Sequence, residues 1–175
     1  MRRLLLFRHA QAVHSAKYSD RERPLTADGR LHAARVGAAL AERGETVDLV
    51  LVSDSLRTRE TLDLALAAYG QASKEASKTP FSRETRVDKA LYHAERRDLM
   101  TTLRALPDSV GTVMIVGHNP AIAEFAAQFA GAGDRESLGR LALGFPPGGL
   151  AIFDCENAEW RQTRWGDGDL KQFLT

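Results

Sequence analysis

Three segments of the chain are largely apolar: residues 4–7, 47–52 and 112–116. Segments of this length are typical of strands in a parallel β-sheet, because helices bury such strands on both faces. Residues 26–43 and 56–69 repeat apolar side chains every three or four positions, which indicates amphipathic helices. Thr26 is the expected N-cap of the first helix, and Gly44 marks its end. The pattern therefore predicts strands that alternate with helices.

The rest of the chain continues this pattern and then departs from it. The polar residues 70–83 predict an exposed loop, and residues 84–88 predict a short strand. Helices are predicted at residues 94–105 and 121–130. Residues 150–154 and 160–165 predict a β-hairpin that turns around residues 156 and 157. We expect an α/β fold: a single-domain, three-layer α/β/α sandwich over residues 1–175, with a mostly parallel central sheet and a C-terminal β-hairpin.

Composition excludes several classes of protein. The chain has 175 residues and a formal net charge of +1, which argues against a nucleic-acid-binding surface. The single cysteine, Cys155, excludes an internal disulfide framework and a multi-cysteine zinc site. No apolar run approaches the roughly 18 residues of a membrane helix, and the first residues lack the apolar length of a secretory signal. We therefore expect a cytoplasmic protein that does not bind membranes.

Arginines and histidines stand where three of the predicted strands end. Arg8 and His9 follow the first strand, Arg57 comes soon after the second, and His118 follows the strand at 112–116. Because ligands of open α/β sheets bind at the carboxyl ends of strands, these side chains should meet at one edge. Arginine matches the oxygens of a phosphoryl group, and a histidine held among cations stays neutral and nucleophilic. The pattern favours metal-free phosphoryl transfer through a phosphohistidine.

Four segments in this order, LLLFRHAQA, RPLTADGRLHA, LVSDSLRTRET and MIVGHNP, resemble the histidine phosphatase superfamily, which is phosphoglycerate-mutase-like. Ala10, where that superfamily more often has glycine, makes the chain similar to its SixA-type phosphohistidine phosphatase branch. The resemblance implies a phosphatase without cofactor or metal. By the same resemblance, His9 is the nucleophile, Arg8 and Arg57 bind the phosphate, and His118 stabilises the transition state as a cation.

The identity of the general acid stays open. Larger members of the superfamily carry a glutamate in a Leu-x-Glu context, and the matching segment here, Leu91-Tyr92-His93, places His93 at that position. Glu95 follows two residues later, so the acid is His93, Glu95 or absent. An imidazole leaving group departs without a strong enzymic acid, whereas an alkoxide needs a proton donor. The missing glutamate therefore favours phosphohistidine as the substrate.

Further candidates surround these residues. Ser15, in the loop after the nucleophile, and Asn119, beside a helix start whose N–H groups could face an anion, are candidate substrate-binding residues. Arg59 competes with Arg57 as the second arginine, but helical spacing and the resemblance favour Arg57. Ion pairs are expected near the rim among Asp20, Arg21 and Arg23.

Three functions remain possible. The first is a phosphatase that acts on protein-borne phosphohistidine through a phospho-His9 intermediate. The second is a small-molecule phosphomonoesterase that uses His93 or Glu95 as its acid, and the third is a non-catalytic phosphoprotein-binding module. Each predicts a phosphorylated partner and a pocket that accepts phosphate or sulfate. A metal site at His9, His93 and His118 is disfavoured because the flanking arginines repel a divalent cation.

Overall fold

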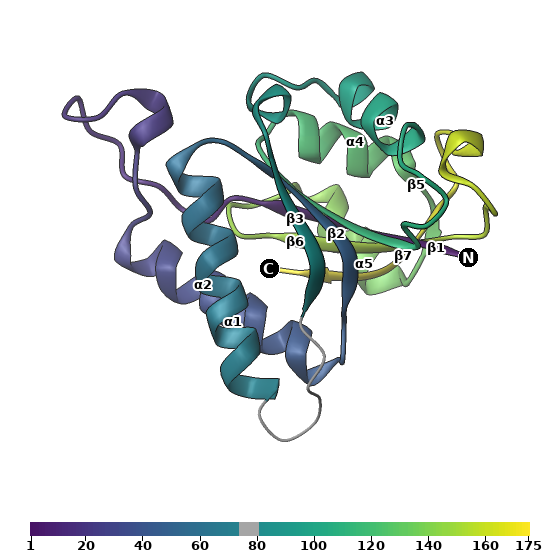
Figure 1. Ribbon diagram of the computed structural model, residues 1–175, viewed down its shortest axis with the longest axis horizontal. Coiled ribbons are helices and arrows are strands. Elements are labelled where there is room, and N and C mark those ends of the chain that lie inside the picture. Colours follow the sequence, from purple (N-terminus) through teal and green to yellow (C-terminus); the bar gives the residue numbers. More distant parts are fainter. Residues whose placement is uncertain (74–80) are drawn as a thin grey trace.

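The computed structural model describes residues 1–73 and 81–175. Its described part contains a sheet of seven strands in the order β3-β2-β4-β1-β6-β7-β5 (Figure 1). The strands are β1 (Arg2–Arg8), β2 (Val47–Ser53), β3 (Ser82–Asp88), β4 (Thr112–Gly117), β5 (Ala130–Gly133), β6 (Leu150–Cys155) and β7 (Gly168–Leu174). Strands β3, β2, β4 and β1 are mutually parallel, β6 runs antiparallel to β1 and β7, and β5 is parallel to β7.

Helices cover both faces of the sheet. On one face lie α1 (Ala27–Glu42) and α2 (Leu56–Ala72), and on the other lie α3 (Arg96–Arg104), α4 (Ala121–Phe129) and α5 (Arg135–Ala142) (Figure 1). Side chains of a strand alternate between faces, so Leu5 and Phe7 pack toward α1 and α2 while Leu4 and Leu6 pack on the opposite side. All four are fully buried, which explains the continuous apolar run. The predicted α/β architecture is confirmed.

The predicted elements of the first half are close to those observed. The strands predicted at 4–7, 47–52 and 112–116 correspond to β1, β2 and β4, and the two predicted helices to α1 and α2. Thr26 is the N-cap of α1, because its hydroxyl accepts a hydrogen bond from the N–H of Gly29 at 3.0 Å. The exposed loop predicted at 70–83 is wrong at both ends, since α2 extends to Ala72 and β3 begins at Ser82. Residues 74–80 lie outside the described residues.

The C-terminal hairpin exists, but its second strand was predicted in the wrong place. Residues 160–162 form a short 3-10 turn, and the strand that pairs with β6 is β7, at residues 168–174. Trp160 is fully buried and donates its indole N–H to the carbonyl oxygen of Val110 at 2.6 Å. The two tryptophans of the segment predicted as a strand, Trp160 and Trp165, therefore lie in this turn and in the turn that follows it. The strand β5 and the helix α5 were not predicted.

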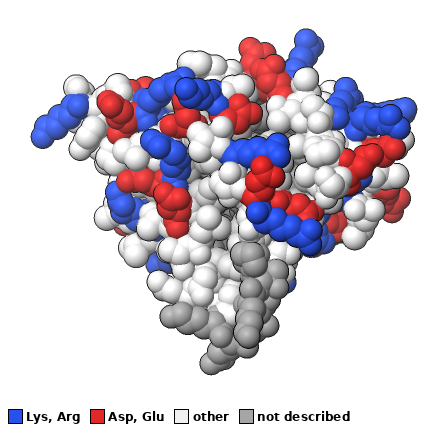
Figure 2. All heavy atoms as spheres, in the orientation of Figure 1, with Lys and Arg blue, Asp and Glu red and all other residues white. Residues whose placement is uncertain are grey.

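The surface carries both signs of charge. On the face seen in Figure 2, basic and acidic side chains are intermingled over the upper part of the molecule. None of the helices formed by the described residues is long and apolar enough to cross a membrane.

Candidate active site

The carboxyl ends of β1, β2 and β4 bring His9, Arg57 and His118 together. These three strands are neighbours and parallel, so the residues that follow them emerge at one edge of the sheet. The N–H of His9 donates to the carbonyl oxygen of Gly117 at 3.1 Å, which ties the end of β1 to that of β4. The rings of His9 and His118 lie 5.3 Å apart between centroids.

The contacts of His9 fix its tautomer. Its Nδ1 lies 2.8 Å from the carbonyl oxygen of Ala10, which can only accept a hydrogen bond, so Nδ1 carries the proton. The lone pair is then on Nε2, which faces the Nε–H of Arg57 at 3.3 Å. Burial, with the charges of Arg57 and Arg8, lowers the pKa of His9 to about 4. The imidazole is therefore neutral at pH 7, with its nucleophilic nitrogen toward the arginine.

Arg57 is the most buried cation of the site, with 5% of its surface exposed. It lies in the first turn of α2, and its Nη2 is 3.4 Å from Nδ1 of His118. The other side of the guanidinium binds Asp20, through the main-chain oxygen at 2.5 Å and the carboxylate at 3.1 Å. Arg59, the competing candidate, is exposed at the surface.

His118 is neutral as well, because of the groups that surround it. Because Nη2 of Arg57 can only donate, Nδ1 of His118 accepts, and its Nε2–H donates to the hydroxyl of Ser53 at 2.8 Å. Burial, with the charge of Arg57 and the proximity of the His9 ring, lowers the pKa of His118 to about 3. The resemblance implied a cation at this position. A phosphoryl dianion beside the ring would raise this pKa, because an opposite charge favours the protonated form.

Arg8 and Asn119 converge on one carbonyl oxygen. Nη1 of Arg8 donates to the main-chain oxygen of Phe145 at 2.7 Å, and the amide of Asn119 donates to the same atom at 3.1 Å. Nε of Arg8 and the side-chain oxygen of Asn119 are buried without a partner among the described residues. Burial lowers the pKa of Arg8. An unpaired buried N–H suits a site that receives an anion.

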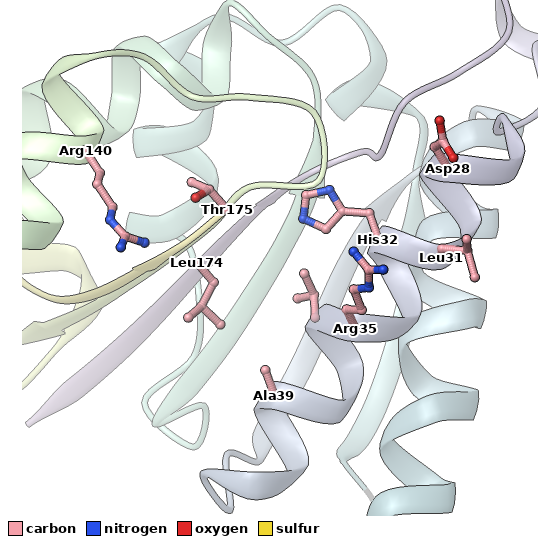
Figure 3. Close-up of a pocket in the computed structure, with 9 residues that line it drawn as sticks. Asp28, Leu31, His32, Arg35, Ala39, Arg140, Leu174 and Thr175 are labelled. Carbon is pink, nitrogen blue, oxygen red and sulfur yellow. The ribbon is translucent and has the colours of Figure 1, made fainter.

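The loop before β6 holds the main chain of His9 in place. The N–H of Gly148 donates to the main-chain oxygen of His9 at 3.0 Å. Gly148 has a φ of +78°, and a Cβ there would lie 2.9 Å from the His32 ring, so only glycine fits. His32 projects from α1 into a groove of about 470 Å³ that also contains Arg35 and Arg140 (Figure 3). None of the three candidate catalytic histidines, His9, His93 and His118, lines this groove.

The two candidate acids lie on the surface. His93 is exposed, and its ring contacts that of Tyr92 edge-on at 4.5 Å between centroids. Glu95 is exposed as well and caps α3, in a reciprocal pair of hydrogen bonds with Asp98. Ser15 stabilises a turn, where its hydroxyl accepts from the following main chain. Among the described residues, none of the three forms a hydrogen bond or a ring contact with His9, Arg57 or His118.

Tyr92 is the residue of this loop that contacts the cations, and no sequence pattern singled it out. Its hydroxyl donates to the carboxylate of Asp20, and its ring lies edge-on to His118 at 5.4 Å. Ser53, the partner of His118, was also missed, although it ends β2 in the segment that the resemblance marked. Of the ion pairs expected among Asp20, Arg21 and Arg23, Asp20 with Arg23 forms at 2.8 Å, whereas Arg21 pairs instead with Asp54 at 2.5 Å.

In the parts of the chain that the structure describes, no three histidine, cysteine, aspartate or glutamate side chains are grouped to hold a metal ion.

The sequence profile of the histidine phosphatase superfamily (branch 1) matches residues 4–89, which include Arg8, His9 and Arg57. The chain belongs to this superfamily. As a histidine phosphatase superfamily member, it is similar in structure to a protein from Nakamurella multipartitia that is provisionally assigned as the phosphohistidine phosphatase SixA. The two are 27% identical with a TM-score of 0.78, and the match covers 99% of this chain and 95% of that one. It therefore extends beyond residue 89 to the part that holds His118.

Two further comparisons place this superfamily member among its relatives. A structure of the protein histidine phosphatase SixA with tungstate has the same fold, at 20% identity and a TM-score of 0.69 over 99% of this chain and 96% of that one. An uncharacterized protein from Mycobacterium leprae is 25% identical over 171 residues, which are 95% of this chain and 97% of that protein.

Proposed function

We propose that this superfamily member is a phosphatase that hydrolyses the phosphorus–nitrogen bond of a phosphohistidine carried by another protein, without metal or cofactor. The observation that supports this proposal is the arrangement at the expected position of the general acid. Tyr92 contacts the cation cluster there, while His93 and Glu95 lie on the surface.

The first step is the transfer of the phosphoryl group to His9. The lone pair on Nε2 attacks phosphorus, the bond from phosphorus to the substrate nitrogen breaks, and its electron pair stays on that nitrogen. The leaving ring departs as neutral imidazole when its other nitrogen carries a proton from solvent. Arg8, Arg57 and His118 stabilise the charge on the three equatorial oxygens, which is the main contribution of a protein to phosphoryl transfer.

The second step regenerates the enzyme. A water molecule attacks phosphorus, the bond to Nε2 of His9 breaks, and dihydrogen phosphate leaves with both protons of that water. The electron pair returns to Nε2, while Nδ1 keeps its proton on the Ala10 carbonyl oxygen throughout. The fixed Nδ1–H therefore holds the ring in one orientation through both steps.

The site offers little to an alkoxide leaving group. Tyr92 is a weak acid here, because burial and its hydrogen bond to Asp20 raise its pKa. Asp20 is ionised, because the hydrogen bond from Tyr92 and the neighbouring arginines hold its pKa well below its usual range. Neither group can protonate an alkoxide efficiently at neutral pH. The names of the similar SixA structures and the tungstate in one of them also support an oxyanion at this site.

A substrate panel tests the proposal. Wild type and the double variant His93→Ala/Glu95→Gln would be assayed on a phosphohistidine-carrying phosphotransfer protein, a phosphohistidine peptide and p-nitrophenyl phosphate. We expect kcat/KM at least about 100-fold higher for the phosphohistidine substrates, and no change in the double variant, since a missing acid penalises only the monoester. A preference for the monoester that the double variant abolishes would instead establish a phosphomonoesterase.

Trapping the intermediate provides a second test. Wild type that has been mixed with substrate and kept out of acid should carry one phosphoryl group on His9, detected by mass measurement. His9→Ala should carry none. Binding without any labelled His9 in wild type would favour a phosphoprotein-binding module.

A further inference from the structure

Asp20 joins three segments of the chain beside the two histidines. It lies in the connection between β1 and α1, and its carboxylate accepts hydrogen bonds from Arg57 at the start of α2 and from Tyr92 before α3. Arg23, from its own segment, binds the other carboxylate oxygen at 2.8 Å. We call these four residues the Asp20 clasp. Although 56% of the Asp20 side chain is exposed, both carboxylate oxygens have charged or polar donors.

The clasp determines which part of Arg57 faces the histidines. Nη1 donates to the main-chain oxygen of Asp20, and Nη2 donates to its carboxylate. A guanidinium is planar, so these two bonds fix its plane and leave the edge formed by Nε and Nη2 toward His9 and His118. That edge is the one that can bind two oxygens of a phosphoryl group.

Tyr92 supports the clasp from the other side. Besides its hydrogen bond to Asp20, its ring lies under the guanidinium of Arg21, whose carbon is 4.2 Å from the ring centroid. Arg21 also pairs with Asp54, which follows β2. The Tyr92 ring and the Asp54 carboxylate therefore fasten the segment that carries Asp20 to the two neighbouring strand ends.

We propose that Asp20 and Tyr92 are positioning residues that hold Arg57 in the orientation needed to bind the transferring phosphoryl group. The role in turnover rests on the proposed function, whereas the orientation of Arg57 does not.

The charge of Asp20 also adjusts the site to its ligand. Arg8, Arg23 and Arg57 all lie close enough to His9 to lower its pKa. The ionised Asp20 cancels one of these three positive charges, which leaves a balance of two for a phosphoryl dianion. A neutral residue at this position would therefore bind inorganic phosphate at least as tightly, while Arg57 would lose its fixed orientation.

This opposition between binding and turnover gives the test. Asp20→Asn and Tyr92→Phe would be compared with Glu22→Gln and Tyr18→Phe, which change an exposed acid and an exposed tyrosine of the same segment. We expect kcat for a phosphohistidine peptide to fall about 100-fold in Asp20→Asn and about 10-fold in Tyr92→Phe, because small misplacements of catalytic groups cost this much. The dissociation constant of inorganic phosphate should stay within threefold or decrease, and both controls should match wild type.

A measurement without turnover separates this proposal from the proposed function. The Nε–H resonance of Arg57 in ¹H–¹⁵N NMR should be sharp in wild type and in both controls, and broadened or lost in Asp20→Asn. If wild type hydrolyses none of the substrates, the proposed function fails, and the resonance still decides whether the clasp holds Arg57. An unchanged Arg57 resonance, a kcat within twofold of wild type in both clasp variants, or weaker phosphate binding at unchanged kcat would overturn the proposal.

Discussion

The chemistry of single residues in this site depends on which ring nitrogen carries the proton. Ala10 selects the tautomer of His9 through a carbonyl oxygen, whereas Ser53 selects that of His118 through a hydroxyl. Only the second partner is a side chain. Ser53 is fully buried, so solvent cannot take the place of its hydroxyl when the residue is truncated.

Replacing Ser53 by alanine should therefore affect both stability and turnover. The Nε2–H of His118 would lose its acceptor, which costs about 1–3 kcal/mol of unfolding free energy for a buried polar group. The ring would also lose its fixed orientation, and we expect kcat to fall about 10-fold or more. Urea unfolding and steady-state kinetics on the same preparation measure both effects. Wild-type kcat in this variant would mean that other contacts orient His118.

Sequence reasoning at this scale found the residues that follow strands and missed those that depend on side-chain direction. Arg8, His9, Arg57 and His118 could be placed because topology alone brings strand ends to one edge. The segment at 91–93 was also identified, but whether Tyr92 or its neighbour faces the cations depends on one turn of backbone that no periodicity encodes.

At the scale of elements, the position of Arg57 depends on how closely α1 and α2 pack. A Cβ added at Gly37, in α1, would lie 2.0 Å from the carbonyl oxygen of Ala65 in α2. Gly70, also in α2, has no heavy atom within 4 Å of the same added position. The two glycines therefore make a matched pair for one substitution.

Gly37→Ala should destabilise the protein by about 3 kcal/mol or more, because the helices must move apart to accommodate the methyl group. Gly70→Ala should stabilise it by about 0.5–1 kcal/mol, through the higher helix propensity of alanine. Thermal and urea unfolding of the two variants beside wild type measure this. Equal effects of the two substitutions would contradict the close contact between α1 and α2.

Elements near the end of the chain show where sequence patterns are insufficient. The segment Ala130–Gly133 forms a strand without a single large side chain, because its pairing with β7 depends on backbone that only the tertiary fold brings near. The early strands were predictable because burial on two faces demands apolar residues at every position. An edge strand of alanine and glycine carries no such demand, so its sequence contains no signal.

The loop that precedes β6 links the sheet to the candidate active site, and a substitution of Asn119 tests this link. Asn119→Ala removes one of the two donors to the Phe145 carbonyl oxygen and leaves Arg8 as the other. We expect KM for phosphorylated substrates to rise several-fold, because Arg8 then holds the loop alone and is less available to the phosphate. Steady-state kinetics measure this. An unchanged KM would mean that Arg8 and the loop are fixed independently of Asn119.

For the whole molecule, the near-zero net charge conceals an uneven distribution. Most arginines of the described surface pair with nearby acids, as in the pairs Arg3–Asp154 and Arg96–Glu124. Among the described residues, the arginines around His9 pair with no acid other than Asp20, and two neutral histidines lie between them. Folding therefore holds His9 and His118 in environments that oppose their protonation, and this makes the stability of the whole protein dependent on pH.

The sign of this dependence follows from the two pKa values of His9. The pKa is about 4 in the folded protein and 6.5 in an unfolded chain, so the unfolded chain takes up the proton first. The contribution of His9 is therefore present above pH 6.5 and is lost as the pH falls toward 4. Between pH 7 and pH 5 this group alone should cost about 2 kcal/mol of unfolding free energy, and His118 should add a similar loss.

Urea unfolding of wild type and His9→Asn at pH 7 and pH 5 measures the effect. Asparagine cannot take up a proton, so the variant should lose about 2 kcal/mol less than wild type between the two pH values. The comparison uses a difference of differences, so any general effect of the substitution on stability cancels. The double variant His9→Asn/His118→Asn should lose still less unfolding free energy between pH 7 and pH 5. The two effects need not be additive, because the two rings are neighbours. If wild type and His9→Asn show the same pH dependence, His9 is protonated as easily in the folded protein as in the unfolded chain, and folding does not lower its pKa.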